Sequence, residues 1–159
     1  LPTAPHLATG RLGTEQLQRL DAALADPAHA KRFRLVVLHH PPHQGAVSKR
    51  KRLEDQEALR AVLAKRGADL VLHGHAHEAL VGSVRGPGGA AIPVLGVPSA
   101  SAKPSRHAPA RWHQIEIVSR AEGGHAVRVV ARGLSEMGTE ISELGRFILA
   151  DLAGRAETA

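Results

Sequence analysis

The sequence contains no cysteine, which excludes a disulfide framework and a thiolate metal site. Tyrosine is missing too, and the aromatic residues besides histidine are Phe33, Phe147 and Trp112, so Leu, Val, Ile and Ala must fill the core. Without aromatic stacking platforms, single-stranded nucleic acid is a poor candidate ligand. No apolar run approaches the roughly 18 residues of a membrane-spanning helix, so we expect no membrane span. With 159 residues, 43% of them hydrophobic, the chain is long enough for one domain, expected over residues 1–159.

Basic residues outnumber acidic ones, because 21 Lys and Arg against 15 Asp and Glu give a formal net charge of +6. Such a balance suits anionic partners, phosphate esters and nucleic acid among them. Residues 1–5 have no initiator methionine and no basic start followed by an apolar stretch, as a signal peptide would have. We therefore expect a loop that continues an upstream segment, in a trimmed or processed cytoplasmic chain.

The first half of the chain alternates helix and strand patterns. The expected order is helix, strand, helix, strand, at residues 14–25, 35–38, 53–66 and 70–72. Thr14 is the expected N-cap of the first helix, Asp26-Pro27 ends it, and Gly67 is the expected C′ residue of the second. The strands are short continuous apolar runs, a pattern typical of strands buried on both faces. Each is followed by histidines, at the end where open α/β sheets bind ligands.

The second half predicts antiparallel hairpins. Strands are expected near residues 79–84, 91–97, 111–118 and 125–131, with glycine- and proline-rich turns between them. The tail from Leu134 is ambiguous, because its apolar residues Ile141, Leu144, Ile148 and Leu149 fit a helix or an irregular extension. The expected fold class is therefore α/β with mixed parallel and antiparallel strands.

Eleven histidines are many for this length, and five of them follow the two buried strands: His39, His40, His73, His75 and His77. Imidazole is a good ligand for zinc, manganese and iron. If the second cluster is extended, alternate side chains point the same way, so that His75 and His77 converge. Gly74 would allow a tight turn beside them. Two such clusters, each closing a buried strand, predict a metal site.

The segments 36–42 (VVLHHPP) and 72–77 (LHGHAH) resemble the last two signature blocks of calcineurin-like metallophosphoesterases. The resemblance covers roughly residues 10–118, and within the family it is to the branch that includes bacterial cyclic-nucleotide phosphodiesterases. It implies an αββα sandwich, present here as its C-terminal portion. It also implies hydrolysis of a phosphomono- or phosphodiester, with nucleotides among the candidate substrates, by water activated by two divalent ions of Mn, Fe or Zn.

Carried over by position, the family pattern makes His39 a ligand of one metal, with His75 beside it, and His77 a ligand of the second. His40 would support a ligand, or exchange roles with His39 if the strand register slips. His73 has no ligand role in the family, and we expect it to point into the core or toward solvent.

The carboxylate-bearing blocks of the family, Asp-x-His, Gly-Asp and Gly-Asn-His-Asp/Glu, do not occur in this sequence, which has no asparagine. Its five aspartates fall at expected helix or strand boundaries, where capping explains them. Because histidines cannot replace a carboxylate that bridges two metals, we expect this chain alone to be inactive. Its expected partners are the missing N-terminal part of the domain or a second copy, since an incomplete sheet leaves an exposed edge.

The run Lys49, Arg50, Lys51 and Arg52 follows the first histidine block closely. These four are candidate substrate-binding residues that would attract phosphate, although charge runs are usually only solvated. His43, in the same loop, is a candidate contact for a leaving group and, with His40, one of two candidate catalytic residues.

Two other interpretations stay open. The chain could be a non-catalytic, degenerate phosphoesterase scaffold that binds anionic partners, which salt-sensitive binding of nucleic acid would favour. His73, His75 and His77 also have the spacing of histidine-triad nucleotide hydrolases, but Gly74 and Glu78 depart from the apolar residues of that motif.

Overall fold

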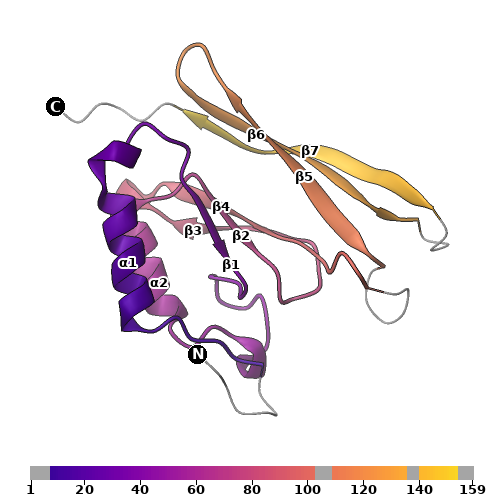
Figure 1. Cartoon of the computed structure of the whole chain (residues 1–159), viewed down its shortest axis with the longest axis horizontal. Coiled ribbons are helices and arrows are strands. Elements are labelled where there is room, and N and C mark those ends of the chain that lie inside the picture. Colours follow the sequence, from indigo (N-terminus) through magenta and orange to yellow (C-terminus); the bar gives the residue numbers. More distant parts are fainter. Residues whose placement is uncertain (1–7, 103–108, 136–139, 154–159) are drawn as a thin grey trace. The chain divides into compact units, whose positions relative to one another are not determined.

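The computed structural model describes residues 8–102, 109–135 and 140–153, so the expectation for residues 1–5 lies outside the described residues. The chain divides into two compact units, residues 1–96 and 97–159. In the described part, the first unit combines helices with a mixed sheet and the second is an antiparallel sheet (Figure 1). The expected mixture of parallel and antiparallel strands in an α/β protein is thereby confirmed.

The strands of the first unit lie in the spatial order β1 (Leu35–Leu38), β2 (Leu70–His73), β4 (Ala91–Gly96) and β3 (Leu80–Arg85). The pairs β1–β2 and β2–β4 are parallel, whereas β3 joins β4 antiparallel. Leu38 pairs with His73, and His73 pairs with Gly96. The three parallel strands therefore end side by side, and the two histidine clusters start from this edge of the sheet.

Helices α1 (Thr14–Ala25) and α2 (Gln56–Arg66) lie side by side and cover one face of this sheet (Figure 1). The short 3-10 helices of the described chain are η1 (Pro27–His29), η2 (Lys49–Lys51) and η3 (Pro87–Gly89). No helix within residues 8–102, 109–135 and 140–153 combines the length and the apolar character needed to cross a membrane.

The start of each α-helix differs from the expectation. Gly13 rather than Thr14 is the N-cap of α1, and no side chain caps the helix at this position. Instead, the Asp55 carboxylate accepts hydrogen bonds from the backbone N–H groups of Leu12 at 3.1 Å and Gly13 at 2.8 Å. Helix α2 begins at Gln56 rather than Leu53, because Leu53 forms a parallel bridge with Gly10.

The core of the first unit lies between the helices and the sheet. Its buried members are Val36, Leu53, Leu59, Leu63, Val71, Val84, Ile92 and Val94. Leu59 and Leu63, four residues apart on α2, are 1% and 0% exposed, and burying each stabilises the fold by about 1.5–3 kcal/mol. Val36 pairs with Val71, which pairs with Val94, so one row of valines crosses three strands beneath the helices. Burial of this row holds the strand register.

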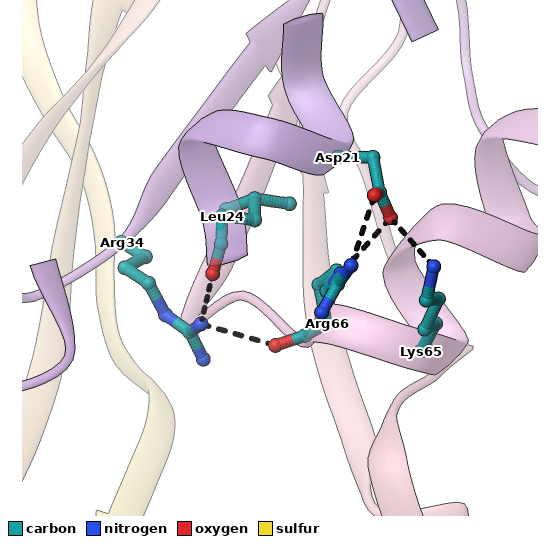
Figure 2. Close-up of polar contacts among 5 residues, drawn as sticks. All are labelled: Asp21, Leu24, Arg34, Lys65 and Arg66. Atoms are coloured by element: carbon teal, nitrogen blue, oxygen red, sulfur yellow. Dashed lines mark hydrogen bonds and ion pairs between the residues drawn. The ribbon is translucent and has the colours of Figure 1, made fainter. Parts of the chain in front are cut away.

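An ion pair joins the two helices. Asp21 accepts hydrogen bonds from Nε and Nη2 of Arg66, each at 3.0 Å, and Lys65 Nζ lies 3.5 Å from the same carboxylate (Figure 2). These hydrogen bonds from Arg66 are the main reason that the pKa of Asp21 is lowered. Asp21 lies in the interior of α1, so the expectation that capping explains all the aspartates is wrong for this residue.

Arg34 satisfies carbonyl groups at the C-terminal ends of both helices. Its Nη1 donates to the carbonyl oxygens of Leu24 at 3.2 Å and Arg66 at 3.0 Å (Figure 2). Carbonyls in the last turn of a helix have no partner within the helix, and a cation also complements their partial negative charge. The side chain that precedes β1 therefore ties this strand to α1 and α2.

The second unit is a sheet of the order β5 (Arg111–Ser119), β6 (Gly124–Leu134) and β7 (Ile141–Ala153), antiparallel throughout. The strands expected near residues 111–118 and 125–131 are confirmed with slightly wider bounds.

The tail is a strand, so both structures considered for it, a helix and an irregular extension, are wrong. The reason lies in two register shifts, which leave Leu144 and Leu149 without a partner on β6. Each such bulge inserts one extra residue and interrupts the alternation of a strand. Apolar residues then recur at spacings of three and four, and that spacing resembles helical periodicity.

Replacing Asp21 by Asn should lower the free energy of unfolding at neutral pH and flatten its dependence on pH. Because the folded-state pKa is lowered, the ionised carboxyl contributes stability above its ordinary value of 3.8, and this contribution is lost as pH falls through the lower folded value. Urea unfolding of both proteins between about pH 7 and about pH 3 measures the effect. Glu57→Gln, at an exposed position of α2, is the control. Equal changes in the two variants would contradict a specific role for the Asp21–Arg66 pair.

Candidate functional site

His39 and His75 bring their rings together at the ends of β1 and β2. His39 Nε2 and His75 Nδ1 lie 3.1 Å apart, so one ring nitrogen donates its hydrogen to the other. Two imidazole nitrogens bound to one tetrahedral ion at about 2.0–2.1 Å would lie about 3.3–3.4 Å apart. The backbone N–H of Gly74 donates to the carbonyl of His39 at 3.1 Å, which extends the strand pairing to this point. The observed separation of the two ring nitrogens is that of a hydrogen bond and is slightly shorter than this ligand spacing.

The loop that carries His75 and His77 is strained rather than extended. His75 and His77 have φ angles of 64° and 58°, and in the described part of the chain they are the non-glycine residues with positive φ. The expectation of an extended segment is therefore wrong, and the left-handed conformation falls on the histidines instead of on Gly74. Each such residue costs about 1–3 kcal/mol and persists where the surroundings hold it, often at functional sites.

His40 supports His75 from the side. Its ring lies 4.0 Å from the His75 ring, centroid to centroid, at an angle of 36°. Its Nε2 donates to the carbonyl oxygen of Ala8 at 3.0 Å. A side chain on Gly10 would collide with the His40 ring, so glycine is required there while the ring stays in place. The segment before α1 thus holds His40 against His75.

The surroundings of His39 and His75 favour the neutral form of both imidazole rings. Burial is the main reason that the pKa values of His39 and His75 are lowered, even though the His39 side chain is exposed overall. The neighbouring rings add to it, because His40 and His77 disfavour a charge on His39, and His40 and His39 disfavour one on His75. A metal ligand must be neutral imidazole, so the environment favours the binding-competent form.

The basic run lies beside this cluster. The carbonyl oxygen of Arg50 accepts from the N–H of Ala8, the same residue whose carbonyl binds His40. The Lys51 carbonyl lies near the His75 ring and favours the protonated form of this ring. His75 Nε2 is buried and makes no hydrogen bond in the described structure. Within the run, the backbone at Lys51 therefore lies near the His75 ring, and the backbone at Arg50 binds the segment that holds His40.

A second pair of histidines, His43 and His73, lies at the same end of the sheet with ring centroids 5.7 Å apart. His73 is 3% exposed, and its Nδ1 donates to the carbonyl oxygen of Gly74 at 3.0 Å. His43 Nδ1 and His73 Nε2 are buried without hydrogen-bond partners in the described residues. His73 points into the core, one of the two orientations expected, whereas the structure places His43 against Gly82 of β3 rather than in the cluster of His39, His40 and His75.

Sequence reasoning did not find the His43–His73 pair. The available signal was glycine within strands, because Gly82 and Gly96 leave room on the sheet for these two rings. A Cβ on Gly96 would lie 2.5 Å from His73 Cε1, whereas one on Gly82 would make an ordinary contact of 3.6 Å with His43 Nε2.

The described residues do not complete a metal site. Among them, no group of three or more His, Asp or Glu side chains is arranged to hold a metal ion. The aspartate carboxylates that the structure describes are engaged in the fold, Asp21 with Arg66, Asp26 with Ala28, Asp55 with Gly13 and Asp69 with Arg34. His39 and His75 could therefore supply at most two ligands to an ion, and the described residues offer no third beside them.

A scan against models of known protein families finds no match, and a search of the curated proteins finds no relative. The resemblance to calcineurin-like metallophosphoesterases therefore depends on the two sequence blocks, residues 36–42 and 72–77, alone.

Replacing Gly96 by Ala should destabilise the first unit by about 1–3 kcal/mol, because the new methyl group would overlap the buried His73 ring. Denaturant unfolding measures the loss. Gly82→Ala, in the neighbouring strand and against His43, is the matched control and should cost less. A larger effect at Gly82 would contradict the crowding of His73.

Proposed function

We propose that this chain is part of a metal-dependent phosphoesterase that hydrolyses a phosphomono- or phosphodiester. The observation that carries the proposal is the 3.1 Å separation of His39 Nε2 and His75 Nδ1 at the carboxyl ends of two neighbouring parallel strands. A divalent ion of Mn, Fe or Zn bound there would supply a Lewis acid for a phosphoryl oxygen and lower the pKa of water. His77, whose charge acts on His39, is the candidate ligand of a second ion.

The tautomers of the two rings explain how they would change from partners to ligands. In the structure one nitrogen of the pair carries the shared hydrogen. For both nitrogens to act as ligands, that hydrogen must move to the far nitrogen of its ring. On His75 the far nitrogen is Nε2, and the Lys51 carbonyl near this ring is a suitable acceptor. Metal-bound histidines commonly donate their second N–H to a backbone carbonyl in this way.

The carboxylates of the site must come from outside the residues given, and β1 offers the place where additional chain would pair. β1 is an edge strand, and Leu35 and Val37 are 44% and 68% exposed. A groove of about 360 Å³ runs along it, lined by Leu20, Phe33 and Val37 among others. We propose that the missing part of the domain, rather than a second copy, adds a strand here and completes the αββα sandwich.

A non-catalytic scaffold that binds anionic partners is the alternative. The net charge of +6 and the exposed run of Lys49–Arg52 favour it if no metal binds. The histidine-triad interpretation receives no such support, because His73 is buried in β2 while His75 and His77 leave the strand in a left-handed conformation.

The purified chain should bind one Mn²⁺ or Zn²⁺ ion through His39 and His75. Titration calorimetry of His39→Asn and His75→Asn should each show an affinity at least about tenfold weaker, because each variant removes one nitrogen ligand. His29→Asn is the control, since His29 follows α1 and binds the Ala23 carbonyl away from the cluster. Unchanged affinity in both test variants would contradict the proposed ligands.

With saturating Mn²⁺, this chain alone should show little or no hydrolysis of bis(4-nitrophenyl) phosphate, because it lacks the bridging carboxylate. We expect the coding sequence upstream of Leu1 to supply Asp-x-His, Gly-Asp and Gly-Asn-His-Asp/Glu in frame. The protein that includes them should hydrolyse the ester and lose this activity in the His39→Asn variant. Metal-dependent hydrolysis by the short chain would contradict its predicted inactivity, and a reading frame that opens at Leu1 would favour the binding scaffold.

A further inference from the structure

The basic run is held in place by backbone hydrogen bonds. The N–H groups of Ala8 and Gly10 donate to the carbonyl oxygens of Arg50 at 3.0 Å and Arg52 at 3.2 Å, and Glu54 N–H donates back to Gly10 at 2.8 Å. Three residues of the run form the 3-10 helix η2, Lys49–Lys51. The backbone of the run is therefore part of a short parallel ladder with the segment before α1.

The same segment joins the run to the histidine cluster. Ala8 binds Arg50 through its N–H and His40 through its carbonyl oxygen, and the His40 ring lies 4.0 Å from that of His75. Ala8 and the His40 ring therefore link the run to the proposed metal ligand His75. The positive charge of Lys51 also lowers the pKa of His75, although burial and the neighbouring histidines lower it more.

The positive charges of the run are not compensated within the described structure. All four side chains are exposed, and none of them takes part in an ion pair in the part of the chain that the structure describes. The carboxylates that follow are occupied elsewhere, because Glu54 accepts from Thr9 Oγ1 and Asp55 accepts from Gly13 N–H. Lys65 and Arg66, in contrast, share the carboxylate of Asp21.

We infer that the substrate carries a second anionic group beyond the phosphate at His39 and His75, and that Lys49–Arg52 bind this group. The inference rests on the proposed function. A single phosphodiester has one negative charge, which would leave most of the four cations without a counterpart. Guanidinium groups suit a phosphate because they bind two of its oxygens at once. The substrate class is therefore a small ester with two phosphate groups, of the bisphosphate or diphosphate kind.

The size of the run favours a small ligand over a nucleic acid. Three residues of 3-10 helix at about 2.0 Å each span about 6 Å, a single turn. Polymer sites extend such charges along a groove and add aromatic rings on which bases stack. Besides histidine, the described aromatic residues are Phe33, Trp112 and Phe147. None of them lies in the basic run or in the histidine loops.

Pyrophosphate and orthophosphate are suitable probes and would be titrated calorimetrically into the full chain. EDTA in the buffer removes metal ions that either anion would otherwise bind. The unsubstituted chain should bind pyrophosphate at least about tenfold more tightly, as expected when a second phosphate adds charge-assisted hydrogen bonds. Arg50→Gln/Arg52→Gln should reduce this ratio to about threefold or less without disturbing the backbone ladder. Arg32→Gln/Arg85→Gln removes two exposed arginines at the opposite end of the sheet and should keep the ratio.

Equal affinity for the two anions, or equal losses in the two arginine variants, would overturn the inference. Tighter, strongly salt-dependent binding of a single-stranded oligonucleotide that is lost with Arg50 and Arg52 would also overturn it, in favour of a polymer. The Mn²⁺ titration reports separately on the proposed function. A retained preference for pyrophosphate in a chain that binds no Mn²⁺ would overturn the phosphoesterase and support an anion site alone.

Discussion

The parallel pairing of β1 with β2 is the constraint on which the rest of the site depends. Leu38 stands opposite His73, so the residues that follow each strand leave the sheet at the same level. A slip of one residue would turn every side chain of β1 to the other face, and the row of Val36 and Val71 beneath the helices prevents it. Arg34 adds to this hold at the start of β1 by binding carbonyls of both helices. Packing far from the histidines therefore decides how near His39 comes to His75.

Residues at the histidine end of the sheet destabilise the fold, and burial of the core between the helices and the sheet offsets this cost. Two residues in the left-handed region cost about 1–3 kcal/mol each, and each buried nitrogen without a partner costs about 1–3 kcal/mol. His43, His73 and His75 each have such a nitrogen in the described structure. The two left-handed residues and the His75 nitrogen lie in the loop after β2, whereas His73 lies in β2 itself and His43 in the loop after β1. The helix junction, in contrast, is joined by two hydrogen bonds of 3.0 Å from Arg66 to Asp21.

Much of this fold could be predicted from local patterns, and the failures share a cause. The apolar runs predicted β1 and β2, and Gly67 predicted the end of α2. These predictions succeed because burial of a short strand and helix termination depend on nearby residues. The bulges at Leu144 and Leu149 are set by pairing with β6, so β7 could not be recognised from its own periodicity. The left-handed conformations of His75 and His77 and the ring contact of His43 with His73 likewise depend on partners distant in the sequence. The same limit applies to the proposed metal site, which stays a prediction from two local sequence blocks, because the described residues include no group of three that could hold an ion.

The charges of the groups around the histidines limit what this chain could contribute to the proposed hydrolysis of a phosphoester. Neutral imidazoles donate lone pairs but add no positive charge to stabilise a phosphoryl group as its negative charge grows. The described aspartates are engaged in the fold, so they cannot anchor a second ion beside His77. In the proposed phosphoesterase, positive charge would therefore come from a bound metal and from Lys49–Arg52, whose backbone is bound to the Ala8–Gly10 segment that also holds His40. Since that segment also positions His40 and through it His75, the proposed anion binding and the proposed ligand geometry would depend on the same few backbone hydrogen bonds. A change in this segment would be expected to weaken both functions together, whereas a change in the arginine side chains alone would affect only the anion.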